Sequence, residues 1–179
     1  MASELHVDAI KHSGGTSALT IDSSGNLTAN ANLHSVGHVV QVVNTEDETS
    51  AATSSTSFIA TTVTATITPK FATSKILVIA QCSLKQSTGT TNGSSIRAQI
   101  YRAGTTAIGK RTEVGTREIA GPNNTDYVSG AYILKVLDSP NTTSATTYTV
   151  YMDCLNSAVS VNINNGTSGS TMTLMEIAQ

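Results

Sequence analysis

Apolar and polar residues alternate with a period of two along most of this chain, which is the pattern of β-strands. In the segment SIRAQIY, Ile96, Ala98 and Ile100 share one face, and the side chains between them share the other. Turn-rich pieces such as QSTGTTNGS and NNGTSGS separate the segments, and none shows a helical period. We therefore predict an all-β chain with an antiparallel β-sandwich or jelly-roll-like domain. The predicted strands cover residues 36–43, 57–67, 75–84, 95–101, 126–137, 146–155, 159–163 and 171–178.

The first 35 residues differ from the rest, because short apolar pieces alternate there with turn signals such as Gly14-Gly15. Such pieces cannot build a core alone. Their apolar residues recur too regularly for a solvated linker, so pairing with another chain or packing over the main domain is favoured over a flexible tail. We predict an extended N-terminal β segment over residues 1–35 and a C-terminal sandwich over residues 36–179.

Two predicted strands, KILVIAQCSL and TMTLMEIA, are apolar on both faces. A sandwich strand faces one core, so its second apolar face needs another cover. A neighbouring subunit and the chain's own loops would both provide it, and the pattern does not separate them. We predict a homo-oligomer whose interface lies near Leu77, Ile79, Met175 and Ile177.

Composition removes several classes of function. Charged residues make up only 12% of the chain and the net charge is −2, which gives no basic surface for nucleic acid. The start MASELHVDAI has no apolar run, so we predict neither a secretory leader nor membrane insertion. Aromatic residues make up 4%, which weakens sugar binding on aromatic platforms but leaves weak, multivalent glycan binding at loop tips open. Cys82 and Cys154 fall at apolar strand positions, where small buried side chains are favoured over a disulfide.

The stretch YRAGTTAIGKRT has Gly104, Gly109 and Lys110 at the spacing of a phosphate-binding loop. Such a loop needs a hydroxyl residue directly after the lysine and then a helix, whereas Arg111 stands there and two glycines and a proline follow. We interpret the stretch as a turn at AGTT, a short strand after it and a second turn at Gly109.

No other pattern indicates catalysis. Glu46, Asp47 and Glu48 lack the ligand pattern of a calcium loop, so a solvated turn is favoured there, and the other acidic residues are scattered. No histidine lies in the main domain beyond His38, and no serine sits in a nucleophile elbow. The four histidines all fall within the first 38 residues, where packed or surface positions are favoured over a metal site on a symmetry axis. We predict a protein that is not an enzyme and holds no metal or other cofactor.

Four segments, taken together and in this order, are the basis of a family resemblance: ELHVDAIKHSGGTSALTIDSSGN, SKILVIA, YRAGTTAIG and MTLMEIA. Together they resemble small tail-fibre-like or appendage virion proteins of bacteriophages, particularly phages of marine bacteria and cyanobacteria. The resemblance implies a homotrimeric β-structured fibre whose N-terminal part joins the virion and whose C-terminal domain points outward.

The function that this resemblance implies is that of a virion structural protein, made in the bacterial cytoplasm, with a role in host-surface adhesion. Its partners would be itself, other virion proteins and a host glycan or receptor. The chain is short for a main host-range fibre and has no shaft repeats, so a tail, neck or head fibre is expected. A capsid decoration or cement protein and a weak carbohydrate-binding module are the alternatives.

Two groups of residues are candidates for these contacts. Apolar residues of the first segment would attach to the virion, and polar loop residues of the outer domain would meet the host. The attachment residues are Leu5, Val7, Ile10, Leu19 and Ile21. The host-contact residues are Thr88, Asn92, Asn123, Asn124, Asp126, Asn141, Asn164 and Asn165.

Overall fold

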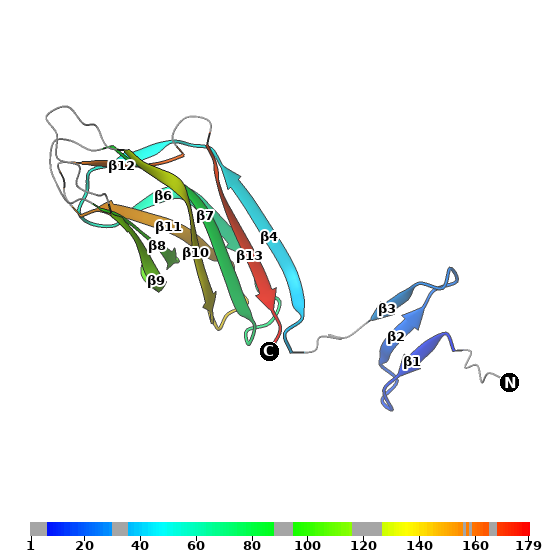
Figure 1. The fold of residues 1–179 in the computed structure, drawn as a ribbon. Coiled ribbons are helices and arrows are strands. Elements are labelled where there is room, and N and C mark those ends of the chain that lie inside the picture. The colour runs from blue at the N-terminus through cyan, green and yellow to red at the C-terminus, as the bar shows by residue number, and fades with distance from the viewer. Residues whose placement is uncertain are drawn as a thin grey trace, which may run out of the picture. The chain divides into compact units, whose positions relative to one another are not determined.

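A computed structural model of the chain is all-β, with antiparallel sheets and no helix in the described residues (Figure 1). The structure describes residues 7–29, 36–87, 95–115, 127–155, 157, 159–164 and 168–179. Within these ranges, no helix of the length and apolarity needed to cross a membrane is found. The chain divides into two compact units, Met1–Ser35 and Val36–Gln179.

The first unit is a small sheet of three antiparallel strands, β1 (Ala9–Lys11), β2 (Ser17–Ile21) and β3 (Leu27–Ala29), in the order β1-β2-β3. Its strands are joined by tight turns. Asp22 accepts hydrogen bonds from the backbone N–H of Ser24 and Asn26, each at 2.9 Å. The Asn26 side chain also donates to Asp22 and is the main reason that the pKa of Asp22 is lowered. The described strands of this segment therefore pair with one another.

The second unit contains two antiparallel sheets packed face to face as a β-sandwich (Figure 1). The first sheet has the order β4-β13-β7-β12-β5, with β10 paired to the other edge of β7. Its strands are β4 (Val39–Asp47), β5 (Ala51–Thr53), β7 (Lys75–Ser87), β10 (Tyr127–Asp138), β12 (Ser160–Ile163) and β13 (Ser170–Ile177). The second sheet has the order β6-β11-β8-β9, with β6 (Ile59–Ile67), β8 (Ser95–Arg102), β9 (Thr106–Gly115) and β11 (Thr146–Cys154).

In the first sheet, β4 and β5 lie end to end along one line, and β12 and β13 lie end to end along the next. Strands β12 and β13 pair one after the other with β7, and β5 and β4 pair one after the other with β12 and β13. Each couple therefore acts as one strand with a short break. The first sheet is in effect four long strands, like the second.

Asn164 closes the break between β12 and β13. Its backbone has a positive φ of 56°, a conformation that Asn tolerates better than most residues. Its buried side-chain amide donates to Asp47 Oδ2 at 2.7 Å and to the Thr49 carbonyl at 3.3 Å. Its Oδ1 accepts from the Ser170 hydroxyl at 2.5 Å. Asn164 thus forms hydrogen bonds with polar groups at both breaks, the one between β12 and β13 and the one between β4 and β5.

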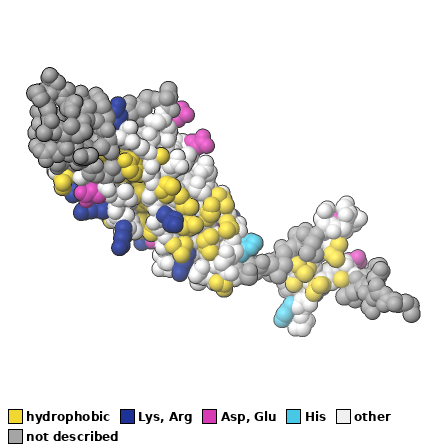
Figure 2. All heavy atoms as spheres, in the orientation of Figure 1, with side chains coloured by type: hydrophobic (Ala, Val, Ile, Leu, Met, Phe, Trp, Pro, Cys, Tyr) yellow, Lys and Arg dark blue, Asp and Glu magenta, His cyan; other side chains and the backbone are white. Residues whose placement is uncertain are grey.

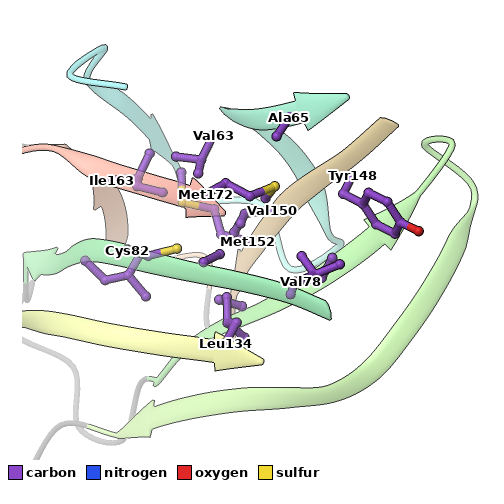
Figure 3. Packing of buried hydrophobic residues seen from close by; sticks show 14 of the residues in the cluster. Val63, Ala65, Val78, Cys82, Leu134, Tyr148, Val150, Met152, Ile163 and Met172 are labelled. Carbon is purple, nitrogen blue, oxygen red and sulfur yellow. The ribbon is translucent and has the colours of Figure 1, made fainter. Parts of the chain in front are cut away.

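The core lies between the two sheets and is built of apolar side chains, most of them aliphatic (Figure 3). Alternate residues of each strand point into it, as the period of two predicts. Both cysteines are buried in it and carry free thiols, which confirms the interpretation as small apolar side chains. Burial raises the pKa of the Cys82 thiol to about 12. Large members of the core include Ile67, Ile76, Leu84, Ile96, Met152, Ile163, Met172 and Leu174.

The structure of YRAGTTAIGKRT agrees with one of the two turns predicted there and not with the other. Ala103 and Gly104 have positive φ values of 51° and 72° and form the predicted turn between β8 and β9. The second turn expected at Gly109 is wrong, because β9 runs through this residue. Gly109, at φ 66°, forms a bulge where the pairing with β8 shifts, and a Cβ there would lie 3.0 Å from the Cβ of Val136. Only glycine fits both the backbone conformation and this close approach.

Candidate functional site

A row of four large apolar side chains crosses the outer face of the first sheet. Leu137 on β10 pairs with Leu77 on β7, Leu77 pairs with Met175 on β13, and Met175 pairs with Val42 on β4. Residues that are directly opposite project from the same side of a sheet. Leu137 and Val42 are 52% and 55% exposed, and the two residues between them are half-buried. The row therefore lies in contact with water.

Neighbouring residues widen this row into a patch, which we name the outer apolar face. Figure 2 shows hydrophobic side chains gathered over these strands, with Lys and Arg side chains among them. Lys135 pairs with Ile79 and stands between Ile133 and Leu137, so one cation lies within the patch, and Lys75, which pairs with Ile177, lies at its end. The outer apolar face consists of Val39, Val42, Leu77, Ile79, Ile133, Leu137, Met175 and Ile177.

All four residues named for an interface from the sequence lie on this face. Sequence reasoning missed the other half of it, namely Val39, Val42, Ile133 and Leu137. A signal for two of them was present, because YILKVL in β10 is also apolar on both faces. The run VVQVV at the start of β4 is apolar on both faces as well, but its outward valines become neighbours of Met175 and Ile177 only through strand pairing.

A shallow hollow of about 360 Å³ lies farther along β7 and β10. Serine hydroxyls, a glycine and one lysine dominate its walls, so the described lining residues offer hydrogen bonds and no carboxylate for acid–base chemistry. Its lining residues are Ser83, Leu84, Lys85, Ser129, Gly130, Ala131 and Ser168.

The small N-terminal sheet also has an open apolar face. Ile10 pairs with Leu19, and Ile21 lies two residues farther along the same strand, so the three share one side. Ile10 and Ile21 are 50% and 40% exposed, which is unusual for two isoleucines of a sheet this small. Val7 is half-buried just before β1, and Leu5 lies outside the described residues.

Most residues named for host contact lie outside the described residues: Thr88, Asn92, Asn123, Asn124, Asp126 and Asn165. Asn141 is exposed at the turn between β10 and β11, with φ 54°. The prediction that Asn164 contacts the host is wrong. Its side chain is fully buried and bonded to Asp47 and Ser170, so it holds the sheet together and is not open to a receptor.

Asp138 joins the two sheets at one end of the sandwich. Arg102 Nη1 on β8 donates to both carboxylate oxygens of Asp138 on β10, each at 2.8 Å. The hydroxyl of Tyr148 on β11 donates to Asp138 Oδ2, also at 2.8 Å. Burial raises the pKa of Tyr148, and the hydrogen bond to Asp138 raises it further. The phenol therefore stays protonated and serves as a buried link between strands.

Glu176 is a second saturated carboxylate, fully buried beneath the β6–β7 connection. Its oxygens accept hydrogen bonds from the backbone N–H of Lys70 at 2.8 Å, from that of Phe71 at 3.1 Å and from Gln41 Nε2 at 2.6 Å. Burial alone would raise the pKa of Glu176, but the hydrogen bonds outweigh it, and the net effect lowers this pKa. The charged carboxylate fixes the connection to the sheet.

These polar groups are occupied with one another and form no reactive set. In the part of the chain that the structure describes, no three His, Cys, Asp or Glu residues are placed to hold a metal ion. What the described residues offer to other molecules is surface, above all the outer apolar face and the open face of the N-terminal sheet.

Comparisons with known proteins do not assign these surfaces. No protein-family model matches the chain, and no curated protein matches it. The function is therefore inferred from the surfaces and from the sequence.

Proposed function

We propose that this protein is a structural component of a bacteriophage virion, a short homotrimeric fibre of the tail, neck or head. The observation that carries the proposal is the outer apolar face. Soluble monomers rarely leave a large contiguous apolar patch in water. Cover by identical copies is the simplest closure, since oligomers of one chain are symmetric and use one patch repeatedly.

The outer domain is proposed to be a jelly roll. When each interrupted strand counts once, the second unit has eight strands in chain order, and its sheets follow the orders 1-8-3-6 and 2-7-4-5. This interleaving of early and late strands supports a jelly roll, in which eight strands form two Greek keys across two sheets. Jelly rolls are common in viral capsid proteins.

The N-terminal sheet is proposed as the virion attachment. Its apolar residues Ile10, Leu19 and Ile21 share a face that three short strands cannot cover by themselves. Three copies would bring three such faces together about a threefold axis. The outer edges of β1 and β3, which pair with no other described strand, would accept a strand from another virion protein. This arrangement gives both trimerisation and attachment a physical basis.

The solution mass of the full-length protein tests the assembly. Light scattering should give about three times the 18.5 kDa of one chain. A mass equal to one chain contradicts the trimer.

Labelling of particles tests the location. Gold-labelled antibodies against residues 36–179 should decorate phage particles at a tail, neck or head position, in few copies. Label spread over the whole shell would indicate a decoration protein, and particles without label contradict a virion protein. Adhesion is tested by binding of the trimer to host cells.

A further inference from the structure

An aromatic cluster lies on the outer face of the second sheet. The rings of Tyr101 on β8 and Tyr151 on β11 are stacked, with centroids 4.1 Å apart and planes at 29°. Phe58, just before β6, adds a third ring with its centroid 6.0 Å from that of Tyr101. All three side chains are partly exposed. A chain with five Tyr, two Phe and no Trp has thus gathered three of its aromatic residues at one exposed place.

Polar side chains lie directly beside these rings. In the pairing of β11 with β8, Thr149 is opposite Tyr101, and Gln99 is opposite Tyr151. The Tyr151 hydroxyl donates to the Gly104 carbonyl at 3.0 Å, which fixes the position of that ring. Within the described residues, the Tyr101 hydroxyl makes no hydrogen bond, so it is available to a ligand.

The cation beside Phe58 is already neutralised. Arg97 lies with its guanidinium 5.8 Å from the centre of the Phe58 ring, and its Nε donates to Asp153 Oδ1 at 2.7 Å. A second hydrogen bond from Nη2 makes this ion pair bidentate. The site therefore presents flat apolar rings and hydrogen-bonding groups with little net charge.

We propose that the cluster of Phe58, Tyr101 and Tyr151 binds one ring of an uncharged saccharide. A pyranose has a C–H face that packs on an aromatic ring and hydroxyls at its edge that need hydrogen bonds. The stacked tyrosines supply the first, while the Tyr101 hydroxyl and the Gln99 side-chain oxygen supply the second. Gln99 Nε2 already donates to the Gly109 carbonyl at 3.1 Å, and the Thr149 hydroxyl is bonded to that of Thr64 at 3.0 Å. A nucleotide is disfavoured because the adjacent arginine is paired with Asp153.

The position of the cluster suits the assembly proposed above. It lies on the sheet that does not carry the outer apolar face, so cover of that face by other subunits leaves the cluster in water. The inference rests on the proposed adhesive function, since a shallow site binds weakly and gains avidity when a trimer presents it three times. It names a glycan as the receptor class and moves the contact from the loops to a sheet.

A glycan array tests the proposal with full-length protein. The probes are uncharged bacterial O-antigen and capsular oligosaccharides, with single-stranded oligothymidine on the same array, and wild-type protein should be retained on at least one of the saccharides. Tyr101→Leu and Tyr151→Leu keep an apolar side chain for folding but remove the ring. Each should lower the apparent affinity by about tenfold or more, the size expected from losing one stacking ring. Tyr101→Phe should retain most of the binding that depends on the ring.

The control is Thr66→Ala, an exposed position on the same sheet, which should bind as the wild type does. Unchanged melting temperatures show that the leucine variants are folded, and if one unfolds the other gives the answer. The proposal is overturned if no glycan retains the wild type, if both folded leucine variants bind normally, or if only single-stranded oligothymidine is retained. Light scattering on the same samples tests the trimer separately from the saccharide site. A trimer that binds no glycan contradicts only the saccharide site. A monomer whose glycan binding depends on Tyr101 contradicts only the trimer.

Discussion

Leu77 and Met175 lie directly opposite each other in the pairing of β7 with β13, and both side chains project from the outer side of the sheet. In an ordinary sandwich, outward positions of this kind are polar. Here the apolar pair continues on both sides into β10 and β4. The centre of the sheet, rather than its edge, is therefore where we expect subunits to meet.

Met175→Glu should dissociate the oligomer. The substitution places a charge in the middle of the apolar row, where contact with another subunit would bury it without a partner. In an isolated chain the same side chain is partly exposed, so the melting temperature of the monomer should change little. Light scattering gives the mass. Thr66→Glu, on the outer face of the other sheet, is the matched control and should keep the native mass. A Met175→Glu protein of native mass would show that subunits meet elsewhere.

Removal of residues 1–35 should leave a folded outer domain that no longer enters particles. The core lies entirely within the second unit, so thermal unfolding of the truncated protein should match that of the corresponding transition in the full chain. Particle incorporation is measured by immunoblot of purified phage. The full-length double variant Ile10→Asp, Ile21→Asp tests the apolar face alone and should also fail to incorporate. If the truncated protein and the double variant both enter particles normally, the N-terminal sheet does not attach the protein to the virion.

Glu176→Gln should destabilise the protein and weaken the dependence of its free energy of unfolding on pH in the acid range. The amide removes the negative charge and turns an N–H₂ group toward backbone donors, which should cost about 2–3 kcal/mol at pH 7. Because the pKa of Glu176 is lowered in the folded state, its contribution is complete above the unfolded pKa of about 4.3 and is lost as pH falls through the folded pKa. Urea unfolding between pH 3 and pH 7 measures both effects. If the variant shows the same pH slope as the wild type below pH 5, Glu176 is not a source of acid sensitivity.

Asn164→Ala should cost more than the same change at Asn141. Both residues have positive φ, so both variants lose about 1 kcal/mol from backbone strain. Asn164 is also buried, and its loss leaves Asp47 and Ser170 without their shared partner, which adds about 1–3 kcal/mol. Chemical denaturation gives the two differences. Equal costs would mean that the interruption of the two strands does not depend on this side chain.

Most strands could be placed from the sequence because alternation is a local property. The inward residues of SIRAQIY in β8 are buried where the pattern puts them, and both cysteines occupy the core. Local chemistry also determined the turn at Ala103 and Gly104. The strand β5 was missed because three residues are too few to show a period. Strand β9 was read as shorter than it is, since a glycine bulge has the same sequence signature as a turn.

What only the tertiary structure decided is which strands become neighbours. Register, not composition, turns scattered residues such as Val42, Met175 and Leu137 into one apolar row. The same pairing stacks Tyr101 on Tyr151, so a chain with few aromatic residues still builds an aromatic surface. Pairing across long stretches of chain depends on the free energy of the whole core and leaves no mark in any short segment. For this protein the sequence determined the strands, and the fold decided the surfaces they make.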